Sequence, residues 1–360
     1  MWRLKVMLTA GKGGMASRPR KKSASPIWDE RRFATPDAEK LYRDVYSKTV
    51  TVVFERGMEL FEHHNDDNMM IATVKTYGWK KFIEKPAQPG ILAIVREFYT
   101  NLKYKRTGEV FVRGKMVPIS HKAISEILDL PPLGATKCAY RRLSNLKPNK
   151  VNLTQIQDAL SLNSGDVDEW VKNKLGKRVN ITLNNYSLSV AMWQHFITHH
   201  ILPSSNSRNI NKDRAFLLYC IKLREPINVV RIILRQMFEV TKKHSPKKQA
   251  TLFFPCLITA LCKKAKVVWN EDDMAIKLKG PITSDLILQG QSKQLRQFYW
   301  GAASTRNRQA TEPSSSTQNE NETSTSGQHE EEHPFPRELS ERQDRNHWEH
   351  QSKSQQTIVR

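Results

Sequence analysis

Residues 211–223 have the sequence Asn-Lys-Asp-Arg-Ala-Phe-Leu-Leu-Tyr-Cys-Ile-Lys-Leu, in which apolar side chains recur at the spacing of one helix face. Three further segments with this spacing, 184–201, 226–243 and 248–265, lie on either side of it. Four consecutive helices with short connections predict a helical bundle, which we place at residues 183–300. The expected fold class is therefore mainly α.

The N-terminal half of the body, residues 33–133, is predicted to be a helical subdomain with a short β-hairpin. Thr35 followed by Pro36 is typical of a helix start, because threonine caps the first amides and proline fits the first turn. Residues 109–119 are rich in β-branched and apolar side chains around a central glycine turn, and they predict the two strands of the hairpin. Ser120 is then expected to cap the next helix.

The remaining segments are expected to be less regular. The β-branched run 49–54 predicts a short strand. Residues 134–182 are rich in turn residues and are predicted to connect the two helical parts through one or two modest helices. Residues 1–32 and 301–360 lack the apolar content that offsets chain entropy, so we expect a disordered basic arm and a disordered polar tail.

The chain is strongly basic, with a formal net charge of +22. Residues 1–32 carry +7, residues 33–300 carry +18 and the tail carries −3, so most of the excess belongs to the folded body. A positive surface of this size favours acidic polymers such as nucleic acid as partners. The alternative is a solvated Lys/Arg surface that only keeps the protein soluble.

The four cysteines are too few and too irregularly spaced for a disulfide framework, so reduced thiols are expected. No run approaches the roughly 18 apolar residues that a membrane span requires. The first residues also make a poor signal peptide, because a charge interrupts a very short apolar stretch. These features predict a protein of the nucleus or cytoplasm with no membrane partner.

No constellation of residues predicts catalysis, a metal site or another cofactor. His195 and His199 share a helix face, but the zinc-protease pattern needs Glu where this chain has Phe196. Cys256 and Cys262 are surrounded by apolar residues and are expected to be small core side chains. The three carboxylates of residues 271–273 are interpreted as a solvated turn. We therefore expect a protein that is not an enzyme.

Basic clusters interleaved with aromatic residues are the remaining candidates for function. Lysine and arginine neutralise phosphates, and tyrosine stacks on bases, so these clusters predict a nucleic-acid surface. The candidate contacts are Arg18, Arg20, Lys21, Lys22, Lys103, Lys105, Arg106, Arg113, Lys115, Arg141, Arg142, Lys242, Lys243, Lys247 and Lys248, with a further cluster at Lys263, Lys264 and Lys266.

Two of these clusters have a purely structural alternative. Residues 242–248 and 263–266 follow predicted helices, and the helix dipole favours cations at a helix C-terminus. The cluster 18–22 has a different alternative, since a compact basic run also serves as a nuclear localisation signal or is a plain solvated tail.

The order of motifs along the chain resembles the putative plant transposon protein family. The resemblance spans most of residues 33–268 and is carried by Tyr77-Gly78-Trp79, Val95-Arg96-Glu97-Phe98-Tyr99-Thr100-Asn101-Leu102, Val112-Arg113-Gly114-Lys115, Asp213-Arg214-Ala215-Phe216-Leu217-Leu218-Tyr219 and Leu252-Phe253-Phe254-Pro255-Cys256-Leu257. It implies descent from a plant mobile element and supplies no catalytic residues.

Three functions remain open. The leading one is a non-catalytic, transposon-derived protein that binds DNA or RNA through backbone charge. The second is an interaction or assembly module, whose partners are other proteins of the element or a second copy of the chain. The third is a degenerate transposase or integrase, which needs several metal-binding carboxylates brought together in space.

Overall fold

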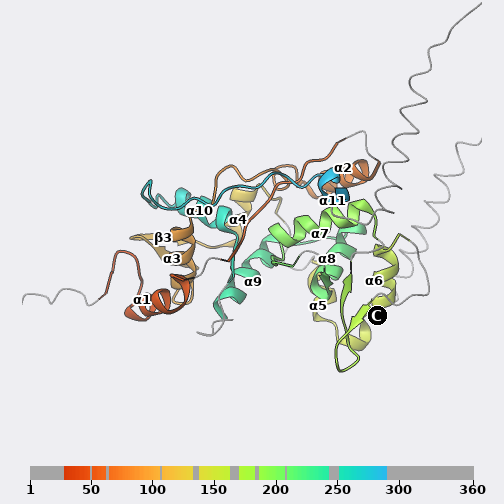
Figure 1. The fold of residues 1–360 in the computed structure, drawn as a ribbon, viewed down its shortest axis with the longest axis horizontal. Coiled ribbons are helices and arrows are strands. Elements are labelled where there is room, and N and C mark those ends of the chain that lie inside the picture. Colours follow the sequence, from red (N-terminus) through yellow and green to blue (C-terminus); the bar gives the residue numbers. More distant parts are fainter. Residues whose placement is uncertain are drawn as a thin grey trace, which may run out of the picture. The chain divides into compact units, whose positions relative to one another are not determined.

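The computed structural model describes residues 28–48, 51–61, 65–105, 108–132, 138–162, 170–182, 186–206, 209–242 and 251–289. The predicted tail 301–360 and all of the predicted arm before residue 28 lie outside them. The α-helices of the described residues are α1 (Pro36–Leu41), α2 (Asn65–Tyr77), α3 (Leu92–Leu102), α4 (His121–Leu128), α5 (Ala139–Asn145), α6 (Leu153–Leu160), α7 (Leu188–His200), α8 (Lys212–Lys222), α9 (Val229–Lys242), α10 (Pro255–Lys264) and α11 (Ser284–Gln289) (Figure 1).

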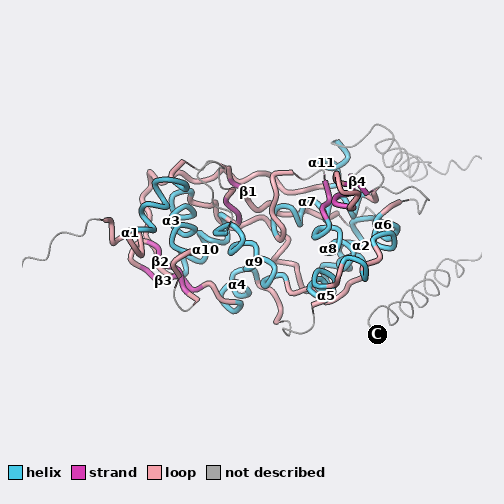
Figure 2. Tube along the Cα trace, turned by 90° about the horizontal axis from the view of Figure 1, so that it is seen from below, coloured by secondary structure: helices cyan, strands magenta, loops and turns pink. Residues whose placement is uncertain are grey.

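Short helical turns and strands complete the fold. A π-helix continues α1 at Tyr42–Tyr46, and a 3₁₀ turn lies at Pro148–Lys150. The strands are β1 (Val52–Val53), β2 (Glu109–Val112), β3 (Lys115–Pro118), β4 (Trp170–Lys172), β5 (Arg178–Thr182), β6 (Asn209–Asn211) and β7 (Leu252–Phe253). Helices outnumber strands throughout, which confirms the mainly α class (Figure 2).

The local start and turn signals in the N-terminal half are confirmed. The hydroxyl of Thr35 accepts a hydrogen bond from the Ala38 amide at the start of α1, and that of Ser120 accepts one from Ala123 in α4. β2 and β3 pair antiparallel around the turn at Arg113 and Gly114, and both turn residues have positive φ. β1 is also present, but it pairs with β7 from the far end of the chain.

The C-terminal helices differ from the predicted bundle in their partners. All four helices form, but α9 and α10 pack mainly on α3 and α4 of the N-terminal half. α3 provides the reason, because nine of its residues are buried and it is therefore covered on most of its circumference. One buried hydrophobic cluster consequently includes residues from Tyr46 to Leu288.

The predicted starts of two of these helices are corrected. The fourth segment was expected to be helical from residue 248, yet Leu252 and Phe253 form β7, and Pro255 is the first helical residue. α9 likewise begins at Val229 and not at Pro226. In the connecting region, α5 and α6 are the modest helices expected, whereas the three-stranded sheet β4–β5–β6 was not predicted.

An aromatic cluster joins the end of α2 to α7. The ring of Trp79 lies edge-on to Trp193, with centroids 6.0 Å apart, and Phe82 meets Phe196 at 5.3 Å. His200 stacks on Phe196 at 4.3 Å. This cluster fixes the loop after α2, which forms one wall of the pocket described below.

The folded body begins before Phe33. Arg32, which the sequence assigned to the basic arm, donates to the carboxylate of Glu97 on α3 at 2.8 Å. The described residues belong to one contact unit, Met1–Ser304, and the boundaries predicted between subdomains stay a prediction. Within the described part of the chain, no helix is long and apolar enough to cross a membrane.

Candidate nucleic-acid interface

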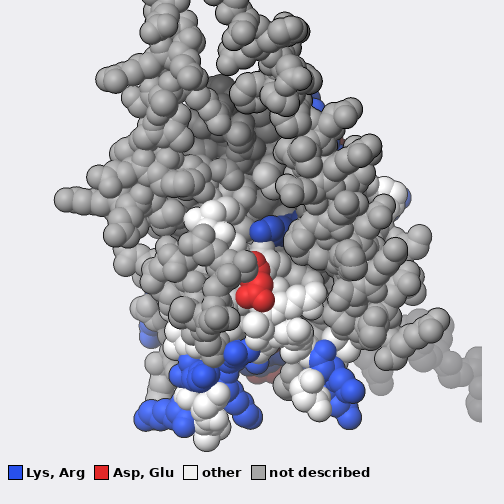
Figure 3. All heavy atoms as spheres, turned by 90° about the vertical axis from the view of Figure 1, so that its right-hand side faces the viewer, with Lys and Arg blue, Asp and Glu red and all other residues white. Residues whose placement is uncertain are grey.

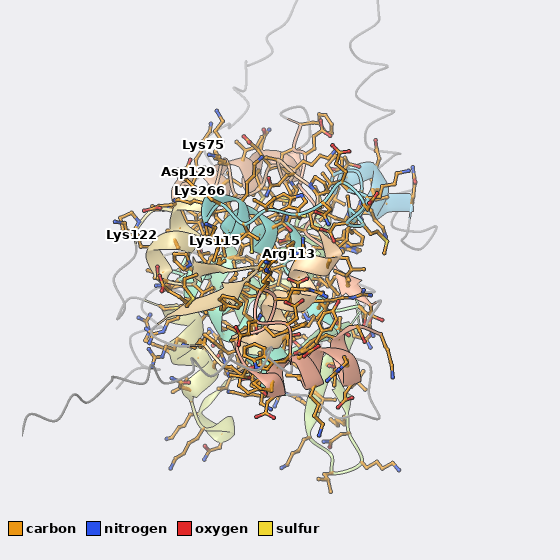
Figure 4. All side chains as sticks on the ribbon, turned by 90° about the vertical axis from the view of Figure 1, so that its left-hand side faces the viewer. Lys75, Arg113, Lys115, Lys122, Asp129 and Lys266 are labelled. Atoms are coloured by element: carbon orange, nitrogen blue, oxygen red, sulfur yellow. The ribbon has the colours of Figure 1, made fainter. Side chains whose placement is uncertain are left out.

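Two adjacent elements and one distant helix bring exposed lysines together. β3 carries Lys115, the following helix α4 carries Lys122, α10 carries Lys263 and Lys264 in its last turn, and Lys266 lies just beyond α10. α10 packs on both α4 and β3, so these five lysines share one surface, which we call the lysine face. Lys115, Lys122 and Lys266 are labelled on the same side of the molecule in Figure 4.

The helix dipole accounts for only part of the lysine face. Lys263 and Lys264 lie in the last turn of α10, where the dipole favours cations. Lys122 occupies the first turn of α4, where the dipole disfavours a cation, and no acidic residue lies in that turn. Lys115 lies on a strand. The helix dipole therefore does not explain why cations occupy positions 115 and 122.

Carboxylates offset little of the positive charge on the lysine face. Lys264 forms an ion pair with Glu126 across the α4–α10 contact, and this hydrogen bond lowers the pKa of Glu126. Asp129 caps α4 with a left-handed backbone and is exposed beside the face (Figure 4). Among the described residues, no carboxylate lies within ion-pair distance of Lys115 or Lys266.

Arg113 adjoins the lysine face, but its guanidinium is held by two carboxylates. Its Nε lies 3.2 Å from the buried Glu97, and its Nη1 donates to Asp273 at 2.7 Å. Burial opposes its charge, but the hydrogen bonds to Asp273 and Glu97 prevail and raise the pKa of Arg113. The same bond lowers the pKa of Asp273, so the turn at 271–273 is not fully solvated as expected.

The other candidate contacts that the structure describes are dispersed. The ammonium of Lys103 lies over the Tyr104 ring and that of Lys105 over Phe238, at 5.6 and 5.0 Å from the centroids. Lys242 pairs with Glu239 within α9. The candidates outside the described residues are Arg18, Arg20, Lys21, Lys22, Arg106, Lys243, Lys247 and Lys248.

A second basic surface surrounds α5. Arg141 and Arg142 are exposed on this helix, and Arg142 lies 3.7 Å from Glu225. Seen from the right-hand side of Figure 1, Lys and Arg side chains gather at the lower end of the described surface (Figure 3). Further exposed lysines between residues 138 and 182 are Lys147, Lys150, Lys172, Lys174 and Lys177.

Two histidines of α7 and two cysteines are held inside the described part of the fold. His199 Nδ1 donates to the Phe54 carbonyl at 3.0 Å, and His200 Nε2 donates to the Arg56 carbonyl at 2.7 Å. Cys256 and Cys262 are buried and unbridged, as expected for core residues. Within the residues that the structure describes, no group of three or more His, Cys, Asp or Glu side chains is placed to hold a metal ion.

A pocket of about 290 Å³ lies between α2, α4 and the segment that leads into α9. Its walls come from the end of α2, the two ends of α4 and the loop that joins α8 to α9. The walls include Thr76, Tyr77, Trp79, His121, Pro132, Arg224 and Asn228.

Sequence reasoning missed Lys122 and Arg224. Neither residue belongs to one of the basic clusters from which the sequence predicted a nucleic-acid surface. The helix start at Ser120 was a usable signal, because it places a lysine in the first turn, where a dipole argument would have marked it as unusual. The approach of α10 to α4, which completes the face, depends on packing between distant segments.

The comparisons with known proteins agree with the resemblance found in the motifs. The model of a family described as "Putative plant retrotransposon-related domain" matches residues 75–268. No curated protein and no solved structure matches the chain. The matched region contains the whole lysine face and every wall of the pocket.

Proposed function

Because this chain belongs to the family of plant retrotransposon-related domains, we propose that it binds the backbone of nucleic acid through the lysine face, without catalysing a reaction on it. The partner is DNA or RNA, in the nucleus or the cytoplasm. The observation that carries the proposal is the convergence of Lys115, Lys122 and Lys263–Lys266 from three separate elements.

The arrangement of these lysines suits a phosphate backbone. Their backbones belong to packed elements while their flexible, exposed side chains keep the ammonium groups solvated. Such lysines bind phosphate as point charges and release counterions, which gives affinity without sequence selection. Arg113, held between two carboxylates, supports the hairpin turn that precedes Lys115.

The proposal is tested by removing four lysines of the face from the full chain. The variant carries Lys115→Gln, Lys122→Gln, Lys263→Gln and Lys266→Gln, and Lys264 is kept because of its ion pair with Glu126. We expect affinity for a short oligonucleotide to fall on the order of a hundredfold at 0.1 M salt, since four counterion-releasing contacts are lost. Fluorescence anisotropy measures the change.

The matched control removes the same charge from the second basic surface. Its substitutions are Lys147→Gln, Lys150→Gln, Lys174→Gln and Lys177→Gln, all at exposed lysines. Both variants keep the N-terminal basic residues and differ from the wild type by the same net charge. A control that loses as much affinity as the face variant would show that general positive charge, and not the lysine face, is responsible.

A further inference from the structure

Exposed cations belong to the chain segments that form the pocket wall. Lys75 precedes Thr76 in the pocket wall and is exposed, and Lys122 follows the wall residue His121. Arg224 is itself a wall residue, is exposed and has a φ of 53°. Figure 4 shows Lys75 and Lys122 on the same side of the molecule as the lysine face. Arg224 therefore places one cation in the pocket wall, and Lys75 and Lys122 adjoin two other wall residues in sequence.

The lining of the pocket combines flat apolar surface with a few polar groups. The Tyr77 ring stacks on Trp79 with centroids 4.4 Å apart, and the Tyr77 hydroxyl donates to the carbonyl of Glu225 at 2.8 Å, so this wall is rigid. The side chain of Asn228 is buried, and its Oδ1 lies 3.1 Å from His121 Nε2. The second ring nitrogen of His121, Nδ1, lies 3.3 Å from the Ser125 hydroxyl, so these polar groups are held in place by the protein itself.

We propose that the pocket receives one unstacked base of a single-stranded nucleic acid, while Lys75, Lys122 and Arg224 hold the adjoining phosphates. This inference rests on the proposed function and narrows its ligand from any nucleic acid to a single strand. The volume of about 290 Å³ is just below the usual range of ligand pockets, about 300–1,000 Å³, and it suits a ligand as small as one ring system.

A single strand is favoured over a duplex by the cost of exposing a base. In a duplex the base must leave its stack and pair, which costs a few kcal/mol, whereas in a single strand it is already available. Recognition of unpaired bases by aromatic and polar pockets, with the backbone held by cations, is a common mode for single strands. Lys75 and Arg224 also argue against an apolar peptide as the occupant, because an apolar peptide offers no anionic group for these cations to bind.

The experiment blocks the pocket in the full chain with Thr76→Trp. Thr76 is exposed at the end of α2, so a larger side chain covers the mouth without entering the core. Thr154→Trp on α6 is the matched control, since Thr154 is also an exposed helix residue and lies outside the pocket. If Thr76→Trp does not fold, as judged by its thermal transition, Pro132→Trp provides the same block from another wall.

Three probes of equal length are compared at one salt concentration: a single-stranded oligonucleotide, the same strand with abasic sugars, and a duplex. We expect the wild type to bind the intact strand about tenfold more tightly than the abasic one, as stacking of one base provides. Thr76→Trp should remove this difference and leave the affinity for the abasic strand unchanged, whereas Thr154→Trp should behave as the wild type does.

Two results would overturn the inference. Both can be distinguished from the result that would refute the proposed function. Equal wild-type affinity for the intact and abasic strands, or unchanged binding of the intact strand by Thr76→Trp, excludes a base in the pocket while backbone binding stands. If the pocket binds an apolar peptide instead, the wild type should likewise bind the intact and abasic strands with equal affinity. If the wild type binds none of the three probes, the proposed function itself fails.

Discussion

At the scale of single residues, the fold depends on a buried carboxylate between two arginines. Glu97 lies on α3 with no solvent exposure, and it accepts hydrogen bonds from Arg32 and Arg113. A buried charge is tolerated only when it is paired and hydrogen-bonded. This network attaches the residues before α1 and the turn of the β2–β3 hairpin to the central helix.

Replacing Glu97 by Gln is expected to lower the free energy of unfolding by about 3 kcal/mol, because Arg32 loses its opposite charge and Arg113 keeps only Asp273. Urea denaturation measures the change. Glu126→Gln, which breaks the solvent-exposed pair with Lys264, is the comparison and should change stability much less. Equal losses in the two variants would show that the burial of Glu97 has no special importance.

Gly90 shows how closely the chain approaches itself. A Cβ added there would lie 2.5 Å from the Cβ of Pro255 and 2.8 Å from its carbonyl carbon, at the start of α10. Gly90→Ala should therefore destabilise the protein by about 1–3 kcal/mol through overpacking. Gly280→Ala is the control, because no atom lies within 4 Å of its added Cβ. Thermal unfolding that is the same for both variants would contradict the close approach.

At the scale of elements, α7 carries three histidines, of which His200 is buried and His195 and His199 are partly buried. Burial lowers the pKa of His195 and His199 to about 4 and that of His200 to about 3. The unfolded chain binds protons on these groups near pH 6.5, well above the folded values. The folded state consequently loses stability as the pH falls from 6.5 towards 4.

His200→Gln tests this pH dependence. Glutamine can still donate to the Arg56 carbonyl but does not titrate. The free energy of unfolding of the variant should therefore fall less steeply between pH 6 and 4 than that of the wild type. The difference between the two slopes should be about 1.4 kcal/mol per pH unit, the contribution of one group. Urea unfolding at a series of pH values provides the slopes. A slope equal to that of the wild type would mean that His200 is protonated in the folded protein.

Elements with local signals were the ones that the sequence predicted well. The cap at Ser120 and the hairpin turn at Gly114 depend on neighbouring residues, and both were found. β7 was taken as part of a helix, because its two residues acquire strand geometry only by pairing with β1, about 200 residues earlier. The lysine face was partly predicted: Lys115 came from a cluster, whereas Lys122 needs the packing of α4 on α10.

At the scale of the whole molecule, the cations behind the net charge of +22 have different surroundings. Some cations are held by carboxylates, as Arg113 is, and others lie over aromatic rings, as Lys103 and Lys105 do. The lysine face and the surface around α5 are two places where exposed lysines gather. Family membership explains the origin of the sequence, and the arrangement of its charges carries the proposal about its function.

The salt dependence of binding tests the central claim most directly. The slope of log K against log salt counts the phosphates neutralised, at about 0.7–0.9 for each contact. For the full chain, we predict that the variant at Lys115, Lys122, Lys263 and Lys266 reduces this slope by about 3 relative to the wild type. The matched variant of the second surface should leave it nearly unchanged. Equal slopes for the wild type and the lysine-face variant would contradict the account.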